Sequence, residues 1–222
     1  MYTVSTFCGM KFLVVTDIHG KRSAVDWINS RAKENGADCV LVLGDITDLG
    51  PEAVASDIIG SVDLDVYAIP GNCDPLTIPS VVADHGIDMH GRSVSIGGIH
   101  LAGLGGSNPT IFDTPFELSE NDIFEKLDAV SEKGMVLMVH APPYGINDTI
   151  PSGLSVGSTG VLKIVKKYKP LLVLSGHIHE AIGIVVKDGT TFINPGPAKE
   201  GRCAVVSVEN GKVETRLFGP TD

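Results

Sequence analysis

Short runs of β-branched and aliphatic residues recur along the chain, and polar residues follow each run within three positions. The five runs occupy residues 11–15, 39–43, 66–69, 135–139 and 171–174. Runs of this length and composition are typical of buried β-strands. Polar residues that follow them lie at the carboxyl ends of the strands, where open α/β sheets bind their ligands. The pattern therefore predicts an α/β fold with one functional site built from several strand ends.

Segments with helical spacing separate the first three runs. Apolar residues from Ala24 to Ala32 recur at helical spacing until Asn35-Gly36 stops the pattern, and residues 52–59 are compatible with a short helix. A strand, a helix and a second strand in this order form a βαβ unit. The polar residues after the first three runs are therefore expected at adjacent strand ends.

Hairpins and further helices are predicted in the second half of the chain. Two apolar runs flank Gly97-Gly98, which indicates a hairpin and an antiparallel part of the sheet. One helix is expected after Ser119 and another before Pro170. Turn residues between alternating apolar positions predict two more hairpins, over residues 182–193 and 203–217.

Two stretches without periodicity remain, residues 105–118 and residues 141–160. Long aperiodic loops in compact domains are usually functional or disordered. Because the second stretch follows His140 directly, we interpret it as a wall of the substrate pocket.

The length and the charge of the chain limit its organisation and its partners. A chain of 222 residues can bury one large core, and we expect a single domain over residues 10–222. Residues 1–9 are expected to be an extension without an assigned function. There are 17 Lys and Arg against 27 Asp and Glu, a formal net charge of -10. This charge repels polyanions and argues against extended nucleic acid as a partner.

Cysteine usage and the distribution of apolar residues limit the compartment. The cysteines, Cys8, Cys39, Cys73 and Cys203, form no CxxC pair, so neither a disulfide framework nor a zinc knuckle is indicated. The first residues lack a basic segment followed by an apolar one, and no apolar stretch reaches the roughly 18 residues that a membrane span needs. We therefore expect a cytoplasmic protein without a membrane partner.

The polar residues after the five runs suit a metal site. They are Asp17-Ile18-His19, Gly44-Asp45, Gly71-Asn72-Cys73-Asp74, His140 and Gly176-His177-Ile178-His179. Water that attacks a phosphate ester must lose a proton and the oxyanion charge must be neutralised, and two divalent metals about 3.5–4 Å apart achieve both. Asp17 and His19 point the same way in an extended strand end, and Asp45 can bridge two metals. Carboxylate, amide and imidazole ligands favour manganese, iron, zinc or nickel over magnesium or calcium.

The order and content of these motifs resemble the calcineurin-like metallophosphoesterase superfamily. Its signature of DxH, GDxxD, GN(H/C)(D/E), a lone His and GHxH is matched in order between about Met10 and His179, with Asp48 completing the second motif. Asn194-Pro195-Gly196 is similar to the closing turn of the family. The resemblance implies a four-layered α/β/β/α sandwich of two mixed β-sheets flanked by helices, with a dinuclear metal site.

The resemblance also implies a role for each matching residue. One metal would be held by Asp17, His19, Asp45 and His179, and the other by Asp45, Asn72, His140 and His177. A hydroxide that bridges the two metals, with manganese favoured as the metal, would be the nucleophile. Asp48 and Asp74 would not bind a metal themselves but would orient the residues that do.

One position departs from the signature of many superfamily members. They have histidine after the Gly-Asn pair, where it stabilises the transition state or protonates the leaving oxygen, and here the position holds Cys73. A free cysteine is also often no more than a small buried apolar side chain, and both interpretations of Cys73 stay open. Small members with the Gly-Asn-Cys-Asp form are more similar to phosphodiesterases or nonspecific phosphatases than to the large protein phosphatases.

Four basic residues close to the motifs are candidates for contact with a substrate phosphate: Lys21, Arg22, Lys199 and Arg202. Charge-assisted hydrogen bonds to phosphate use such side chains. Surface lysines and arginines are more often simply solvated, and we favour that interpretation for each of them.

The sequence thus predicts a dinuclear metal-dependent phosphohydrolase that acts on a phosphodiester or a small phosphomonoester, and we favour the phosphodiester. The residues expected at the chemistry are Asp45, Asn72, His140 and, as an open question, Cys73, supported by Asp48 and Asp74. A protein-binding scaffold on the same fold is the alternative, and the intact ligand set argues against it. A DNA nuclease is disfavoured by the acidic charge. A homo-oligomer is left open.

Overall fold

The computed structural model describes residues 9–222, which form two six-stranded sheets. The extension expected at residues 1–9 lies outside this range apart from Gly9. The first sheet has the order β12-β11-β1-β2-β3-β4. Its strands are β1 (Met10–Val15), β2 (Cys39–Val42), β3 (Val66–Ala68), β4 (Ile87–Asp88), β11 (Cys203–Glu209) and β12 (Lys212–Phe218). Strands β1 to β4 are parallel, whereas β11 pairs antiparallel with both β1 and β12.

The second sheet has the order β5-β6-β7-β8-β10-β9. Its strands are β5 (Arg92–Ile96), β6 (Ile99–Leu104), β7 (Val136–Val139), β8 (Leu172–Leu174), β9 (Gly183–Lys187) and β10 (Thr190–Asn194). The four central strands are parallel, and β5 and β9 are antiparallel edges. The three predicted hairpins are confirmed as β5–β6, β9–β10 and β11–β12.

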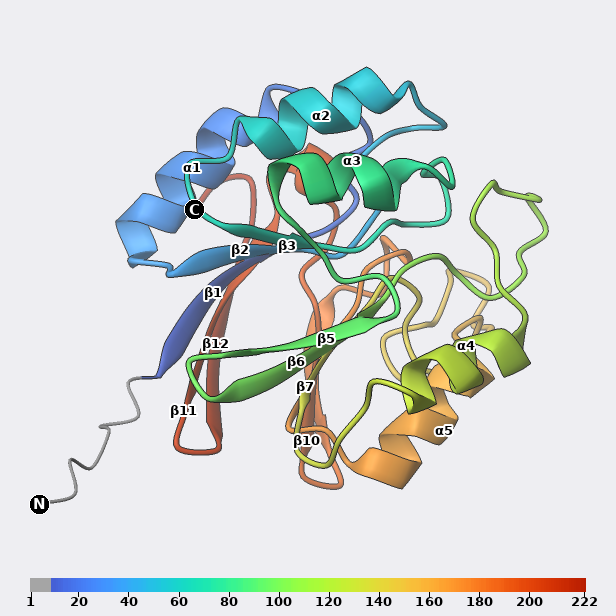
Figure 1. Ribbon diagram of the computed structural model, residues 1–222. Helices are drawn as coiled ribbons and strands as arrows, with labels where there is room; N and C mark the ends of the chain where they lie inside the picture. Colours follow the sequence, from blue (N-terminus) through green and yellow to red (C-terminus); the bar gives the residue numbers. More distant parts are fainter. Residues whose placement is uncertain (1–8) are drawn as a thin grey trace, which may run out of the picture.

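Helices cover the outer face of each sheet (Figure 1). The helices of the first sheet are α1 (Ala24–Asn35), α2 (Glu52–Gly60) and α3 (Ile78–His85). The second sheet is covered by α4 (Glu120–Asp128) and α5 (Thr159–Tyr168), and a short 3-10 turn, η1 (Ala198–Glu200), precedes β11. The expected four-layered α/β/β/α sandwich is therefore confirmed.

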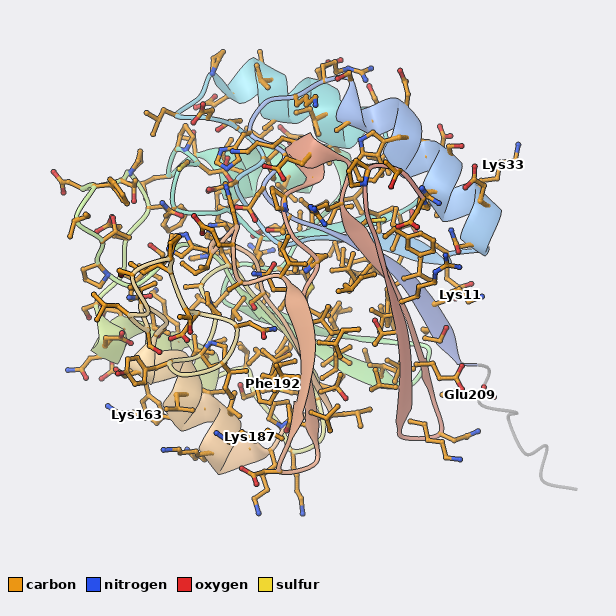
Figure 2. All side chains as sticks on the ribbon, turned by 180° about the vertical axis from the view of Figure 1, so that it is seen from behind. Lys11, Lys33, Lys163, Lys187, Phe192 and Glu209 are labelled. Atoms are coloured by element: carbon orange, nitrogen blue, oxygen red, sulfur yellow. The ribbon has the colours of Figure 1, made fainter. Side chains whose placement is uncertain are left out.

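Three hydrophobic clusters hold the four layers together. Along β1, Phe12 and Val14 belong to the cluster between the two sheets, whereas Leu13 and Val15 belong to the cluster under α1 to α3. Successive side chains of a strand point to opposite faces, so a strand buried on both faces needs an unbroken apolar run. This requirement explains the runs in the sequence. Figure 2 labels Phe192 of β10, which belongs to the third cluster beneath α4 and α5.

The helix ends agree with the sequence signals, with one helix and one strand missed. Helix α1 is followed by Gly36 at φ 61°, a left-handed conformation that glycine adopts without strain. Ser119 caps α4 by accepting a hydrogen bond from the Asp122 backbone. The sequence interpretation did not include α3, which carries Pro79 in its first turn, or the two-residue strand β4. The two residues of β4 are too few for a periodic pattern to develop.

The carboxyl ends of five strands meet at one end of the sandwich. The residue pattern alone predicted one sheet crevice, whereas β1, β2 and β3 belong to the first sheet and β7 and β8 to the second. Backbone hydrogen bonds join the loops that leave them: the Asp17 amide donates to Gly44 O (3.0 Å) and the Gly176 amide to His140 O (3.0 Å). Within residues 9–222, no helix has both the length and the apolar character to cross a bilayer.

Candidate metal centre

The structure brings the seven predicted metal ligands together in two neighbouring groups. In the first group, Asp17 Oδ1 lies 3.2 Å from His179 Nε2 and 3.8 Å from His19 Nε2. The two imidazole nitrogens of that group are 3.4 Å apart. In the second group, Asn72 Oδ1 lies 2.9 Å from His140 Nε2. The rings of His140 and His177 are 5.0 Å apart.

Asp45 joins the two groups. Its Oδ2 lies 3.6 Å from His19 Nε2, and its Oδ1 lies 3.5 Å from His140 Nε2. The two oxygens of one buried carboxylate therefore face different sets of ligands. A side chain placed in this way can contact two cations at once.

Several of the predicted ligands have an unusual backbone conformation. Asp17, His19, Asp45 and His177 have φ values of 54°, 47°, 49° and 66°. A positive φ is uncommon for residues other than glycine, and residues held in such conformations cluster at functional sites, where each costs about 1–3 kcal/mol. The sharp change of direction after each strand turns the polar side chains towards a common centre. The fold thus tolerates local strain where it directs these side chains towards one another.

The glycine of each motif is required by close contact between strand ends. A Cβ on Gly71 would lie 2.0 Å from Asp45 Oδ1, and a Cβ on Gly44 would lie 2.5 Å from the Gly71 amide nitrogen. A Cβ on Gly176 would lie 2.0 Å from Thr16 Oγ1. Only glycine allows the loops to approach so closely, and the ligands can converge because they do.

The charges in the centre favour ionised carboxylates and act differently on two of its imidazoles. Burial alone would raise the pKa of Asp17, but the His179 and His140 imidazoles outweigh it and lower that pKa. The pKa of Asp45 is likewise lowered, because His140 and His19 outweigh the effect of burial. Burial lowers the pKa of His177 to about 4, with His140 acting in the same direction. Burial lowers the pKa of His140, but Asp45 and Asp17 outweigh it and raise that pKa to about 9. Ionised carboxylates and neutral imidazoles are the forms that coordinate a cation, so His140 has to lose a proton when a metal binds.

An unpaired oxygen supports the same conclusion. Asp17 Oδ1 is buried and has no hydrogen-bond partner among the described residues. A buried acceptor without a partner costs about 1–3 kcal/mol, and more when it is charged. A cation within reach of Asp17, His19 and His179 would satisfy this oxygen. The residues therefore fit a divalent metal, and their mixed carboxylate, amide and imidazole donors suit a transition metal.

Hydrogen bonds to neighbouring residues fix the orientation of two side chains of the second group. His140 Nδ1 donates to Leu43 O over 2.8 Å, which leaves Nε2 facing the centre. Asn72 Nδ2 donates to Thr114 Oγ1 (3.1 Å) and to Cys73 Sγ (3.6 Å). Both amide protons are thereby used, and Asn72 Oδ1 is left to face His140.

Glu117 supports this amide through Thr114, and neither residue was predicted from the sequence. Glu117 Oε1 accepts hydrogen bonds from Thr114 Oγ1 (2.6 Å) and the Thr114 amide (2.9 Å). Burial opposes ionisation, but the hydrogen bonds from Thr110 and Thr114 prevail and lower the pKa of Glu117 to about 2. The two residues lie in the aperiodic stretch, where no motif or period marks them. Thr16 was also missed, and its Oγ1 donates to Asp17 Oδ2 (2.8 Å).

The two supporting carboxylates predicted from the sequence differ in their contacts. Asp74 accepts hydrogen bonds from the backbone amides of Gly71 (2.8 Å) and Ile46 (3.1 Å), and it also accepts from Thr47. It therefore joins the loops after β2 and β3, although burial and the charge of Asp45 raise its pKa to about 6. Asp48 is 71% exposed, and its Oδ1 lies 3.7 Å from His19 Nδ1.

Cys73 lies at the edge of the centre with its thiol partly exposed to solvent. Its amide donates to Asp45 Oδ1 over 2.8 Å, so its backbone helps to hold the residue that joins the two groups. Burial and the neighbouring Asp45 raise the pKa of the Cys73 thiol well above its usual range. The thiol is therefore neutral near pH 7.

The four basic candidates are mostly engaged elsewhere. Lys21 donates to Lys199 O (2.5 Å), Arg22 pairs with Asp57, and Arg202 lies 3.7 Å from Glu200. The Lys199 amide donates to Asp17 O over 3.2 Å. Of the four candidates, Lys199 is therefore the one with a backbone contact to a predicted ligand residue.

Comparison with known proteins places the motifs in a family. Residues 10–181 match the family model described as calcineurin-like phosphoesterase. Uncharacterized protein MJ1162 of Methanocaldococcus jannaschii is 32% identical over 197 residues, which cover 85% of this chain and 88% of that protein. Metallophosphoesterase domain-containing protein 1 of Homo sapiens is 34% identical over 74 residues, 32% of this chain and 23% of that protein.

Solved structures share the fold at low sequence identity. TT1561 of Thermus thermophilus superposes with a TM-score of 0.73 at 18% identity, over 94% of this chain and 99% of the other. A novel archaeal phosphodiesterase gives a TM-score of 0.58 at 16% identity, over 95% and 99%. GAP50, named as the anchor in the inner membrane complex of Plasmodium, gives 0.65 at 12% identity, over 96% and 85%. Because one of these proteins is named a phosphodiesterase and another an anchor, this likeness supports the fold and leaves the activity to the site.

Proposed function

The chain belongs to the calcineurin-like phosphoesterase family, and we propose that it is a dinuclear enzyme that hydrolyses phosphodiesters. The family and the cluster of aspartate and histidine side chains support a metal-dependent phosphoesterase. The observation that carries the dinuclear proposal is the position of Asp45, whose two oxygens face two different groups of ligands.

We assign four residues to each cation. Asp17, His19, Asp45 and His179 would hold one, and Asp45, Asn72, His140 and His177 would hold the other. When bound, the cations would lower the pKa of a water molecule and neutralise charge on the phosphoryl oxygens. Mixed nitrogen and oxygen donors suit manganese, iron, zinc and nickel, and manganese is our first choice among these four metals.

The chain itself sets the separation of the two groups of ligands and the orientation of their side chains. Asp45 fixes the separation of the two groups, and the Leu43 carbonyl holds the His140 ring so that Nε2 points inwards. Glu117 and Thr114 hold the Asn72 amide with its oxygen directed at the centre. Such supporting contacts matter, since changes to them typically lower metal affinity or activity by about 10–100-fold.

The proposal predicts that activity depends on added metal. Protein treated with a chelator and then dialysed should not hydrolyse bis(4-nitrophenyl) phosphate, and Mn²⁺ should restore turnover. The measurement is the release of nitrophenolate with Mn²⁺, Fe²⁺, Zn²⁺, Ni²⁺ or Mg²⁺, with 4-nitrophenyl phosphate as the matched monoester. A higher kcat/KM on the diester is expected.

Two results would contradict parts of this proposal. Faster turnover of the monoester would reverse the preference for diesters. Failure of every metal to support turnover of either ester, in protein that binds metal, would favour a protein-binding scaffold on the same fold.

Cys73 gives a second prediction, on the dependence of rate on the leaving group. A positioned general acid contributes about 10²–10⁴-fold when the leaving group is poor, and a thiol at this position is a weaker acid than an imidazolium. We therefore expect fast cleavage of nitrophenyl esters and slow cleavage of alkyl esters. Cys73→His should raise kcat/KM more for the alkyl esters. The measurement is a plot of log kcat/KM against leaving-group pKa for both proteins.

Cys73→Ser is the matched control, because it replaces the thiol with a small side chain that has no imidazole. Its plot should keep the slope of the unmodified protein. If the Cys73→His plot has that slope too, position 73 takes no part in protonation and its role is structural.

A further inference from the structure

A large cavity adjoins the candidate metal centre on one side. Its volume is about 630 Å³, and His177 and His179 form part of its wall. The rest of the wall comes from the two aperiodic loops, at residues 108–112 and 150–156, and from Glu180. The loop that we expected to border a substrate pocket lies here. Small-molecule sites typically have about 300–1,000 Å³, so this cavity has room for far more than a phosphate group.

The cavity wall is apolar, although it opens to solvent. Ile111, Phe112 and Leu154 are 93%, 76% and 63% exposed. Isolated exposed apolar residues are normal, whereas several around one depression mark a binding site. The wall therefore suits an apolar occupant.

Away from the metal centre, the charges of the wall disfavour an anionic occupant. Among the described residues that form it there is no lysine or arginine, and Glu180 adds a carboxylate. A second phosphate or a carboxylate on the substrate would meet this negative charge without a partner. An uncharged group would not.

The two loops are held in place without any occupant. Glu117 accepts hydrogen bonds from the Thr110 amide (3.0 Å) and the Thr110 hydroxyl (2.6 Å). The buried Asp148 accepts from the amides of Gly145 (2.8 Å) and Gly157 (3.0 Å). Asn108 Nδ2 donates to Val156 O over 3.3 Å and joins one loop to the other. The cavity is thus preformed, and little ordering has to accompany binding.

We propose that this cavity binds an uncharged, bulky apolar group of the phosphodiester while its phosphate lies at the metal centre. The inference rests on the proposed function, and it narrows the substrate to an amphiphilic ester. The apolar group can be an alkyl or isoprenoid chain or an aromatic system. Because His177 and His179 belong to both the wall and the ligand set, one substrate can occupy both places.

The test uses the manganese-loaded protein and 4-nitrophenyl diesters that share one leaving group. The second ester group is methyl, n-hexyl, phenyl or a hexyl chain ending in a carboxylate. We expect kcat/KM to rise at least about tenfold from methyl to hexyl or phenyl. The carboxylate should abolish that gain. The ratio of hexyl to phenyl distinguishes a chain from an aromatic group as the natural occupant.

Variants link the selectivity to the cavity. Leu154→Ser and Phe112→Ser should each lower the hexyl-to-methyl ratio by at least about threefold. The matched control is Val186→Ser, which changes a 72% exposed apolar residue on β9 outside the cavity and should keep the ratio. Equal kcat/KM for all four esters, or the same ratio in every variant, would overturn the proposal and leave the phosphodiesterase function standing.

A binding measurement separates the two proposals. Non-hydrolysable methylphosphonate monoesters with methyl or hexyl groups can be titrated calorimetrically into manganese-loaded protein. Tighter binding of the hexyl compound, by at least about tenfold and weakened in Leu154→Ser, supports the cavity even if no ester is hydrolysed. Leu154→Ser can instead abolish binding to phosphatidylcholine vesicles, or self-association, and leave the ester selectivity unchanged. In that case the surface binds a membrane or a second copy of the chain, and the proposal is wrong.

Discussion

Replacement of Asp45 by alanine is expected to lower kcat/KM by at least about 10³-fold and to reduce the bound manganese. Asp45 is the ligand whose two oxygens face both groups, at 3.6 Å from His19 Nε2 and 3.5 Å from His140 Nε2. Metal ions stabilise the transition state by several kcal/mol, and each 1.36 kcal/mol corresponds to about tenfold in rate. The measurements are kcat/KM on bis(4-nitrophenyl) phosphate and metal content by elemental analysis.

Asp45→Asn and Asp84→Ala make the result interpretable. Asp45 Oδ1 accepts a hydrogen bond from the Cys73 amide, and an asparagine keeps an acceptor and the volume while it removes the charge. Asp45→Asn should therefore fold even if Asp45→Ala does not, and it should show the same loss. Asp84→Ala removes an exposed carboxylate from α3 and should behave as the unmodified protein. Undiminished turnover in folded Asp45→Asn would refute the dinuclear proposal.

Much of the fold could be predicted because the central strands are buried on both faces. Phe12 and Leu13 lie in different hydrophobic clusters although they are neighbours. Both faces of β1 must therefore be apolar, and the unbroken run indicates the strand and its end. The polar residue that follows then marks the site. The candidate ligands could be named from the sequence for this reason, since each lies within five residues of the end of an apolar run.

The supporting contacts could not be predicted in the same way. Glu117 follows no apolar run, and its link to Asn72 passes through Thr114, which is 42 residues from Asn72 along the chain. No local pattern encodes a contact of that kind. The division of the strand ends between two sheets was likewise absent from the residue pattern, because an apolar run does not specify which sheet a strand joins. The resemblance to a family supplied the two sheets, and the structure supplied the contacts.

The strained ligands and the close glycine contacts have a common cause. Positive φ angles at Asp17, His19 and Asp45 turn the side chains inwards, and glycines let the loops approach until those side chains meet. The centre therefore depends on the separation of the loop backbones as much as on the ligands. A change that adds one carbon atom between two loops should damage the site without removal of any ligand.

Gly71→Ala makes that change, and we expect it to destabilise the protein by about 3 kcal/mol and to lower kcat/KM by about 10²-fold. The new Cβ would lie 2.0 Å from Asp45 Oδ1 and 2.2 Å from the Asp45 amide nitrogen. Because the backbone there cannot yield like the end of a flexible side chain, Asp45 has to move. For a chain of this size, about 3 kcal/mol corresponds to a Tm lower by roughly 6–12 °C. Thermal unfolding with a chelator and with Mn²⁺ separates the loss of stability from the loss of metal binding.

Gly183→Ala is the matched control for this prediction. Neither glycine has a positive φ, so the same methyl group adds no backbone strain at either position. A Cβ on Gly183 meets nothing within 4 Å, and Gly183→Ala should keep the Tm and kcat/KM of the unmodified protein. If Gly71→Ala yields no folded protein while Gly183→Ala folds normally, the close approach is required for folding itself. If both variants match the unmodified protein, the loops can separate at no cost, and close contact between strand ends does not explain the glycine after β3.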